Sequence, residues 1–192
     1  MASLSESELH EIVHRVVENA IGSPAAKPAA TPLAPAQTQA STKRVVALGA
    51  DHGGYELKEA LKPDLAALGF EIQDLGTNSK DAVDYPDFAH AVAQAVGTGK
   101  AWRGIMIDGA GIGSCIVANK VPGVRAGMAY DISSANNSRE HNDTNVLTLG
   151  AGLIGVSLAK QIVKTWLTTE FAAGRHTARL DKIKSVEKKY LK

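Results

Sequence analysis

The sequence predicts an α/β fold in which a five-stranded parallel sheet lies between two layers of helices. Short apolar runs of strand length alternate with segments of helix length from residue 43 onward. Strands separated by helices favour parallel pairing, because each connection crosses back over the sheet. The composition agrees with one domain of this class, since 44% of the 192 residues are hydrophobic and 21% are charged.

Residues 1–22, which precede this domain, predict a separate amphipathic helix. Apolar residues between Leu9 and Ile21 recur at the spacing of one helix face. Ser5 and Glu8 have the spacing of a capping box. A single helix of this length is marginally stable in water, so its apolar face needs a surface to bind.

Residues 23–42 predict an extended linker, because they hold four of the seven prolines and no aromatic residue. A helix that docks on its own domain does not need a linker of this length, so we favour an address or docking segment over local docking. Acidic residues in the helix disfavour a mitochondrial transit peptide. The domain boundaries are therefore 1–22, 23–42 and 43–192.

Within the domain, five apolar runs predict the strands: Arg44–Gly49, Phe70–Leu75, Arg103–Ile107, Val124–Met128 and Asn145–Leu149. Six helices are predicted to start near Gly54, Asp87, Ile112, Ser133, Val156 and Arg175. Ligands of parallel sheets bind at the carboxyl ends of the strands. Polar residues suited to a site follow three of these strands: Asp51, His52, Asp108 and Asp131.

Charge and cysteine content exclude several classes of protein. A net charge of +1 gives no reason to expect a nucleic acid or an anionic membrane as partner. The one cysteine, Cys115, cannot form an internal disulfide and suits a reducing cytosol. No apolar run reaches the roughly 18 residues of a membrane span, and no signal peptide is predicted. The six histidines lack the spacing of metal ligands, so we expect no metal.

The stretch IDGAGIGSCIVANK, residues 107–120, predicts a loop whose backbone amides bind an anion. Its three glycines, Gly109, Gly111 and Gly113, are evenly spaced at two residues, which disfavours a dinucleotide site. A nest of amides for a developing oxyanion fits better. Asp108 at its entrance is electrostatically unfavourable there unless it moves a proton; the alternative is that it caps the next helix.

Four further residues are candidates for binding a phosphorylated ligand. Asp51 and His52 in GADHGGYELK suit a phosphate or hydroxyl contact, although a turn can use such residues for backbone reasons alone. Arg175 and Arg179 in GRHTAR share one helix face and could bind a phosphate together, or form a solvated basic helix end.

Two other motifs each present one candidate. His141 in SREHND suits proton transfer, and a capping role is equally compatible with the sequence. Tyr85 in VDYPDF precedes a helix-starting proline and could simply pack there.

In this order, DHGGYELK, VDYPDF, GAGIG…ANKVPGVRA, SREHNDTNVL and GRH…R resemble the ribose-5-phosphate isomerase B family, which includes the two subunits of galactose-6-phosphate isomerase. The resemblance spans residues 44–184. It implies a Rossmann-like (flavodoxin-like) fold, no cofactor, and a homodimer or tetramer with active sites at subunit interfaces. It also implies interconversion of an aldose and a ketose phosphate through an enediolate, with ribose 5-phosphate to ribulose 5-phosphate as the first expectation.

The resemblance also implies roles for single residues. His141 would help to open the sugar ring, and the amides of the loop Gly109, Ala110, Gly111 and Gly113 would hold the enediolate oxygen. Residues that would hold sugar hydroxyls are Asp51, Tyr85 and Asn142. Residues that would bind the phosphate, some from a neighbouring subunit, are His52, Arg175 and Arg179.

Four positions depart from the family pattern. Many members have a cysteine base where this chain has Asp108, and a threonine where it has Ala110. Another branch uses a glutamate where this chain has Ser114, and a family arginine is here Gly152. Either Asp108 replaces the base, or the site acts on a different sugar such as a tetrose or hexose phosphate, or the chain binds sugar phosphate without catalysis.

The helix and linker at the N-terminus resemble the encapsulation peptides that direct enzymes into bacterial microcompartments. The resemblance implies a cytoplasmic enzyme packaged inside such a compartment, with residues 1–22 binding a shell or cargo protein.

Deleting residues 1–42 tests whether the helix is an address segment. We expect the melting temperature and the activity to stay at the values of the full chain, because the domain's core does not need the segment, while association with a shell or partner protein is lost. A large loss of stability would instead show that the helix docks on its own domain.

Overall fold

The computed structural model describes residues 7, 10, 11, 13–15 and 44–191. The chain divides into two units, Met1–Ala40 and Ser41–Lys192. In the first unit, the described residues are helical. The rest of the predicted N-terminal helix and the predicted linker lie outside the described residues.

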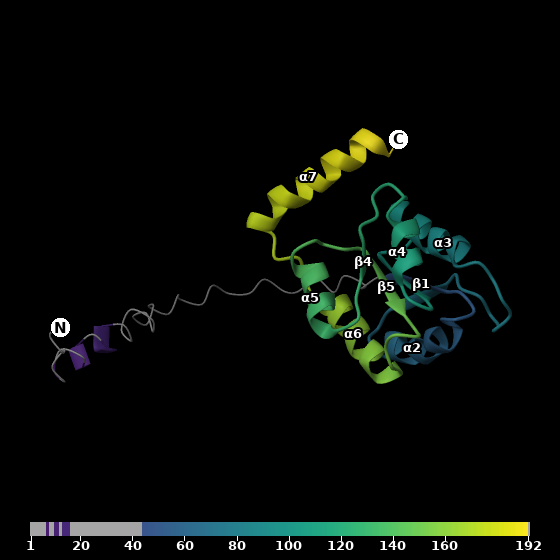
Figure 1. Cartoon of the computed structure of the whole chain (residues 1–192), viewed down its shortest axis with the longest axis horizontal. Coiled ribbons are helices and arrows are strands. Elements are labelled where there is room, and N and C mark those ends of the chain that lie inside the picture. The colour runs from purple at the N-terminus through teal and green to yellow at the C-terminus, as the bar shows by residue number, and fades with distance from the viewer. Residues whose placement is uncertain (1–6, 8–9, 12, 16–43, 192) are drawn as a thin grey trace, which may run out of the picture. The chain divides into compact units, whose positions relative to one another are not determined.

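The second unit is built on a five-stranded sheet in which all recorded pairings are parallel (Figure 1). Each strand lies within two residues of its predicted position: β1 (Val45–Ala50), β2 (Glu71–Asp74), β3 (Arg103–Asp108), β4 (Ala126–Met128) and β5 (Val146–Gly150). The three-layer parallel class is therefore confirmed.

The order of the strands is β2-β1-β3-β5-β4. A flavodoxin-like order would place β4 next to β3, whereas here β5 lies between them. In this arrangement every residue of β5 is buried, while the three residues of β4 are half-buried. The apolar strand takes the interior position and the short one takes the edge, which limits the exposed backbone available for pairing with another chain.

Helices cover both faces of the sheet (Figure 1). One face carries α2 (Tyr55–Ala67), α5 (Ile132–Glu140) and α6 (Val156–Thr168), and the other carries α3 (Tyr85–Gly97) and α4 (Ile112–Ala118). Alternate residues of each strand enter the two cores. Val46 and Leu48 pack on the first face with the fully buried Trp166 of α6, and Ala47 packs on the second with Val92 of α3.

The connectivity determines which ends of the helices and strands meet at each edge of the sheet. Every helix that follows a strand starts at the edge where the strands end, here called the carboxyl edge, and returns to the opposite amino edge. The ends of α5 and α6 meet at the amino edge, where the Ala172 amide donates to the Glu140 carbonyl at 3.0 Å and Arg139 Nε donates to the Thr169 carbonyl at 3.3 Å.

The last helix, α7 (Arg175–Tyr190), starts at this amino edge after Ala173 and Gly174, which both have positive φ. Its buried residues are His176 and Leu180. Ile183, Val186 and Tyr190 are exposed, so α7 presents apolar side chains beyond its own domain. In the part of the chain that the structure describes, no helix is long and apolar enough to cross a bilayer.

Candidate active site

Several of the predicted site residues gather at the carboxyl edge. We call Asp51, His52, Tyr85, Asp108 and the glycine loop (residues 109–113) the carboxyl-edge group. Asp51 is 6% exposed, and its Oδ1 accepts a hydrogen bond from the Gly54 amide at 3.0 Å. A Cβ at Gly53 would lie 3.4 Å from Asp51 Oδ1 and 3.5 Å from the Gly109 nitrogen, so the loops after β1 and β3 are in contact.

The loop before α3 completes this group. The Tyr85 ring lies so close to Gly113 that a Cβ there would be 2.5 Å from Tyr85 Cζ, which leaves room only for glycine. His52 Nδ1 lies 3.1 Å from the Val83 carbonyl oxygen and 3.2 Å from the Val83 amide. These contacts bring the tyrosine to the loop that carries the predicted oxyanion cradle.

Asp108 is the last residue of β3 and is 5% exposed. Its Oδ1 accepts from the amides of Ala110, at 2.8 Å, and Gly111. Its Oδ2 accepts from the Ser114 amide at 3.2 Å and from the Ser114 hydroxyl. The carboxylate therefore caps the loop and the first turn of α4 with four hydrogen bonds.

This arrangement changes how the glycine loop is used. Two of the amides that were predicted to face the enediolate, those of Ala110 and Gly111, are occupied by a carboxylate of the chain itself. Four donors aimed at one carboxylate use the acceptor positions of both its oxygens. For Asp108 to accept a proton from carbon, at least one of these bonds must open.

The position of the missing family arginine lies against the same loop. The Gly152 amide donates to the Gly109 carbonyl at 3.0 Å, and a Cβ at residue 152 would also lie 3.0 Å from that oxygen. A side chain at this position would require the glycine loop to shift. Glycine here thus fits the close contact between the loops after β3 and β5.

The remaining predicted residues lie at the other edge of the sheet. We call His141, Asn142, Arg175 and Arg179 the amino-edge group. His141 follows α5, and Arg175 is the first residue of α7. A cleft of about 190 Å³ collects three of the group and is lined by Asn137, His141, Asn142, His176, Arg179, Leu180 and Ile183.

Two buried or half-buried arginines hold the turn that presents His141 and Asn142. Asp143 has a φ of 45°, and its Oδ1 accepts from Arg139 Nη1 at 2.8 Å while its Oδ2 accepts from Arg125 Nη2 at 2.9 Å. Arg139, which is 4% exposed, also donates to the Thr144 carbonyl. The SREHND motif therefore combines two predicted ligand contacts with the charged residues that position them.

The sequence did not single out His176, which stacks on His141. Their ring centroids are 4.2 Å apart with an interplanar angle of 7°. Burial, followed by the neighbouring His141, Arg175 and Arg179 side chains, lowers the pKa of His176. The sequence signal for His176 was its place directly after Arg175 in GRHTAR. A residue next to a predicted phosphate ligand, at the start of the same helix, lies close to that ligand's site.

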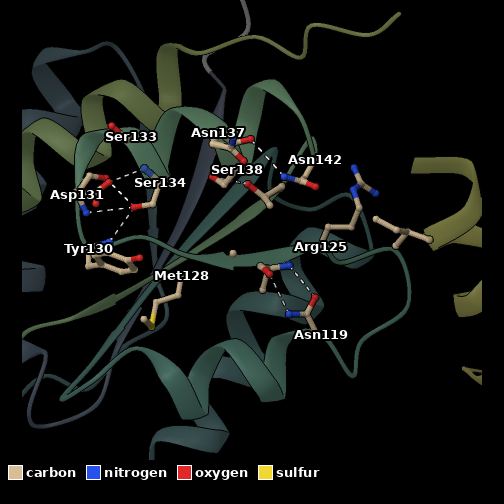
Figure 2. Close-up of a pocket in the computed structure, with 14 residues that line it drawn as sticks. Asn119, Arg125, Met128, Tyr130, Asp131, Ser133, Ser134, Asn137, Ser138 and Asn142 are labelled. Atoms are coloured by element: carbon tan, nitrogen blue, oxygen red, sulfur yellow. Dashed lines mark hydrogen bonds between the residues drawn. The ribbon is translucent and has the colours of Figure 1, made fainter. Parts of the chain in front are cut away.

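A larger cleft of about 700 Å³ adjoins the smaller cleft and shares Asn137, Asn142 and Ile183 with it. Figure 2 shows Asn137 and Asn142 joined by a hydrogen bond at one end of this cleft. Arg125 lies in the same view beside Asn119, whose side chain pairs with the backbone of Ala126. This cleft follows the edge strand β4.

One chain therefore places the predicted site residues in two separate groups, one at each edge of the sheet. The strands separate the two edges, and the six residues of β3 span roughly 20 Å at about 3.3 Å per residue. Asp51 and Asp108 cannot reach the sugar that His141 and Arg179 of the same chain would hold. Asp131, noted at the carboxyl edge, caps α5 by accepting from the Ser134 amide at 2.6 Å.

Comparison with known proteins identifies the family. The family model for ribose/galactose isomerases matches residues 46–183. The chain belongs to the ribose/galactose isomerase family. Its members most similar to the chain include ribose-5-phosphate isomerase B of Escherichia coli, which is 43% identical over 144 residues, or 75% of this chain and 97% of that protein.

Another family member, D-erythrulose-4-phosphate isomerase of Pectobacterium atrosepticum, is 40% identical over 72% of this chain and 91% of its own length. The solved structure of Clostridium thermocellum ribose-5-phosphate isomerase B is 49% identical and superposes with a TM-score of 0.75, covering 76% of this chain and 99% of that one. This member of the ribose/galactose isomerase family is thus a sugar-phosphate isomerase.

Proposed function

We propose that this chain interconverts ribose 5-phosphate and ribulose 5-phosphate, without a cofactor, at sites shared between two copies. The observation that carries this proposal is the division of the predicted site between the two edges of one sheet. The carboxyl-edge group supplies acids and hydroxyl ligands, and the amino-edge group supplies an imidazole and two arginines. The Escherichia coli relative, named for ribose 5-phosphate, supports this substrate.

The reaction needs a base, an oxyanion contact and a phosphate clamp. The base removes the proton from C2 of the aldose, and that electron pair forms the C1–C2 double bond while the carbonyl oxygen becomes the enediolate oxygen. A proton then returns to C1, and the proton of the C2 hydroxyl moves to the oxygen on C1. Each part corresponds to side chains or amides of the two groups.

A two-fold dimer would complete both sites at once. In such a dimer the same surface of each copy contacts the other, so the amino-edge group of one copy meets the carboxyl-edge group of its partner and the reverse. The exposed apolar residues support this arrangement, because they lie in two places that would then face each other. Ile183, Val186 and Tyr190 lie on α7, whereas Ile112, Tyr130 and Leu153 lie at or near the carboxyl edge.

We also propose that residues 1–22 package the enzyme in a microcompartment by binding a shell or cargo protein. This segment lies outside the family match, which starts at residue 46, so the isomerase domain does not account for it; this supports packaging. The helical state of the described residues in the segment is compatible with it.

An isomerase assay over tetrose, pentose and hexose phosphates tests the substrate. We expect the highest kcat/KM with ribose 5-phosphate. A preference for a tetrose phosphate would instead match the relative named for D-erythrulose 4-phosphate. Binding of sugar phosphates with turnover of none would identify a non-catalytic member, and would refute the proposed reaction.

Asp108→Asn tests whether this residue is the base. The change preserves size and removes the negative charge, so turnover should fall by about 10²–10⁴-fold with little change in substrate affinity. Exchange of the substrate's C2 proton with deuterated solvent should fall in parallel. The amide cannot accept from all the donors that now surround it, so the free energy of unfolding should also fall by about 1–3 kcal/mol.

The two roles of Asp108 separate in this experiment. Turnover near that of the parent, together with lowered stability in urea, would make Asp108 a helix cap and place the base elsewhere. Asp108→Cys is the matched variant, because a thiolate restores the family's usual base and should retain part of the activity.

Mixing two inactive variants tests the shared site. Asp51→Asn damages the carboxyl-edge group, and His141→Ala damages the amino-edge group. Refolding equal amounts together should restore about a quarter of the parent's activity, because about half of the dimers are mixed and each mixed dimer has one intact site of two. The same variants mixed without subunit exchange serve as the control. No recovery after proven exchange would contradict the shared site.

A further inference from the structure

The ring of His141 receives a hydrogen bond that determines which of its nitrogens carries the proton. Asn137 lies one helical turn earlier on α5, and its Nδ2 is 2.9 Å from His141 Nδ1. In this structure the nitrogen of the Asn137 amide, rather than its oxygen, faces the ring; with that orientation the amide donates and Nδ1 accepts without a proton of its own. The neutral imidazole then carries its proton on Nε2.

The surroundings of the ring leave Nε2 as the nitrogen that can contact a ligand. The ring lines the 190 Å³ cleft together with Arg179. Nδ1 is already bonded to Asn137, whereas the nearest recorded acceptor to Nε2 is Glu140 Oε1 at 3.9 Å, beyond hydrogen-bond distance. A ligand oxygen in the cleft could therefore accept from Nε2.

His176 covers one face of the His141 ring in a nearly parallel stack. Arg175 Nε lies 3.4 Å from His176 Nε2, so the stack is joined to the predicted phosphate contact. Burial and the neighbouring His141, Arg175 and Arg179 lower the pKa of His176, which keeps its ring neutral near neutral pH. Stacking fixes the plane of the His141 ring, and Asn137 fixes the direction of its nitrogens.

We propose that Asn137 is a positioning residue that holds His141 in the Nε2–H tautomer, so that His141 acts as a neutral hydrogen-bond donor to an oxygen of the sugar. The identity of that ligand rests on the proposed function, whereas the tautomer does not. A proton on Nδ1 would face the Asn137 amide donor, so of the two neutral tautomers the one with the proton on Nε2 keeps this bond. A neutral imidazole can polarise a sugar oxygen without giving up its proton.

Nitrogen NMR of the full-length protein, uniformly labelled with ¹⁵N, measures the tautomer directly. In the parent at mildly alkaline pH, we expect the unprotonated nitrogen of His141 to be Nδ1. Asn137→Asp places an acceptor at the same point, so the proton should move to Nδ1. Asn137→Leu removes the donor without adding charge, and both tautomers should then be populated. Gln161→Leu is the control, because it removes a helical amide bond to Ser157 on α6.

Kinetics with ribose 5-phosphate as the probe give the functional readout. Asn137→Asp should lower kcat by about tenfold or more with a smaller change in KM, because Nε2 no longer donates. Gln161→Leu should keep the parent's values. A merely structural role for Asn137 would lower stability and leave the tautomer of the folded variant unchanged.

Two results would overturn the inference: a parent in which Nδ1 carries the proton, or folded Asn137 variants that retain the parent's tautomer. If Asn137→Asp does not fold, the tautomer in Asn137→Leu decides. A third result separates the two proposals: the parent shows the Nε2–H tautomer and Asn137→Asp its reversal, while the protein isomerises no sugar phosphate. That result would support this inference and refute the proposed function.

Discussion

Parallel connectivity is the constraint on which the rest of this structure depends. Because each strand is followed by a helix that returns across the sheet, residues that directly follow strands and residues that follow helices lie at opposite edges. Asp51 and Asp108 belong to the first class, and His141 and Arg175 belong to the second. No rotation of side chains can bridge the length of the strands between them. The fold therefore keeps the two groups apart within one chain, and the proposed two-fold dimer rests on this separation.

Electrostatics at the carboxyl edge set a second condition on the chemistry. The glycine loop and the start of α4 offer several backbone donors, and a negative group is favourable there. In this chain the negative group is the buried Asp108 carboxylate. A substrate oxyanion would have to share these amides with it or displace it. The same bonds that make Asp108 a good cap thus limit when it can act as a base, and isomerisation would require the loop to exchange hydrogen-bond partners.

At the amino edge, one set of charged residues, Arg125, Arg139 and Asp143, holds the turn in place. Asp143 lies between Arg125 and Arg139, and this pairing supports a left-handed residue in the turn next to His141. Removing Asp143 would leave the almost fully buried Arg139 without its carboxylate partner. The imidazole is then set by three contacts of different kinds: the turn, the stacked His176 and the amide of Asn137. Such rigid support is what a residue needs to meet one oxygen of a bound sugar repeatedly.

The sequence by itself determined the strands and helices, since apolar runs and their spacing are local properties. It also located the polar residues at strand ends, and its motifs were sufficient to recognise the family. The sequence did not predict the exchange of β4 and β5, because strand order depends on how the strands pack against one another in the folded sheet. The occupation of the loop amides by Asp108, the stacking of His176 and the bond from Asn137 to His141 were likewise decided by tertiary structure. Each depends on distances between side chains and backbone groups, and those distances are set only once the helices have packed on the sheet.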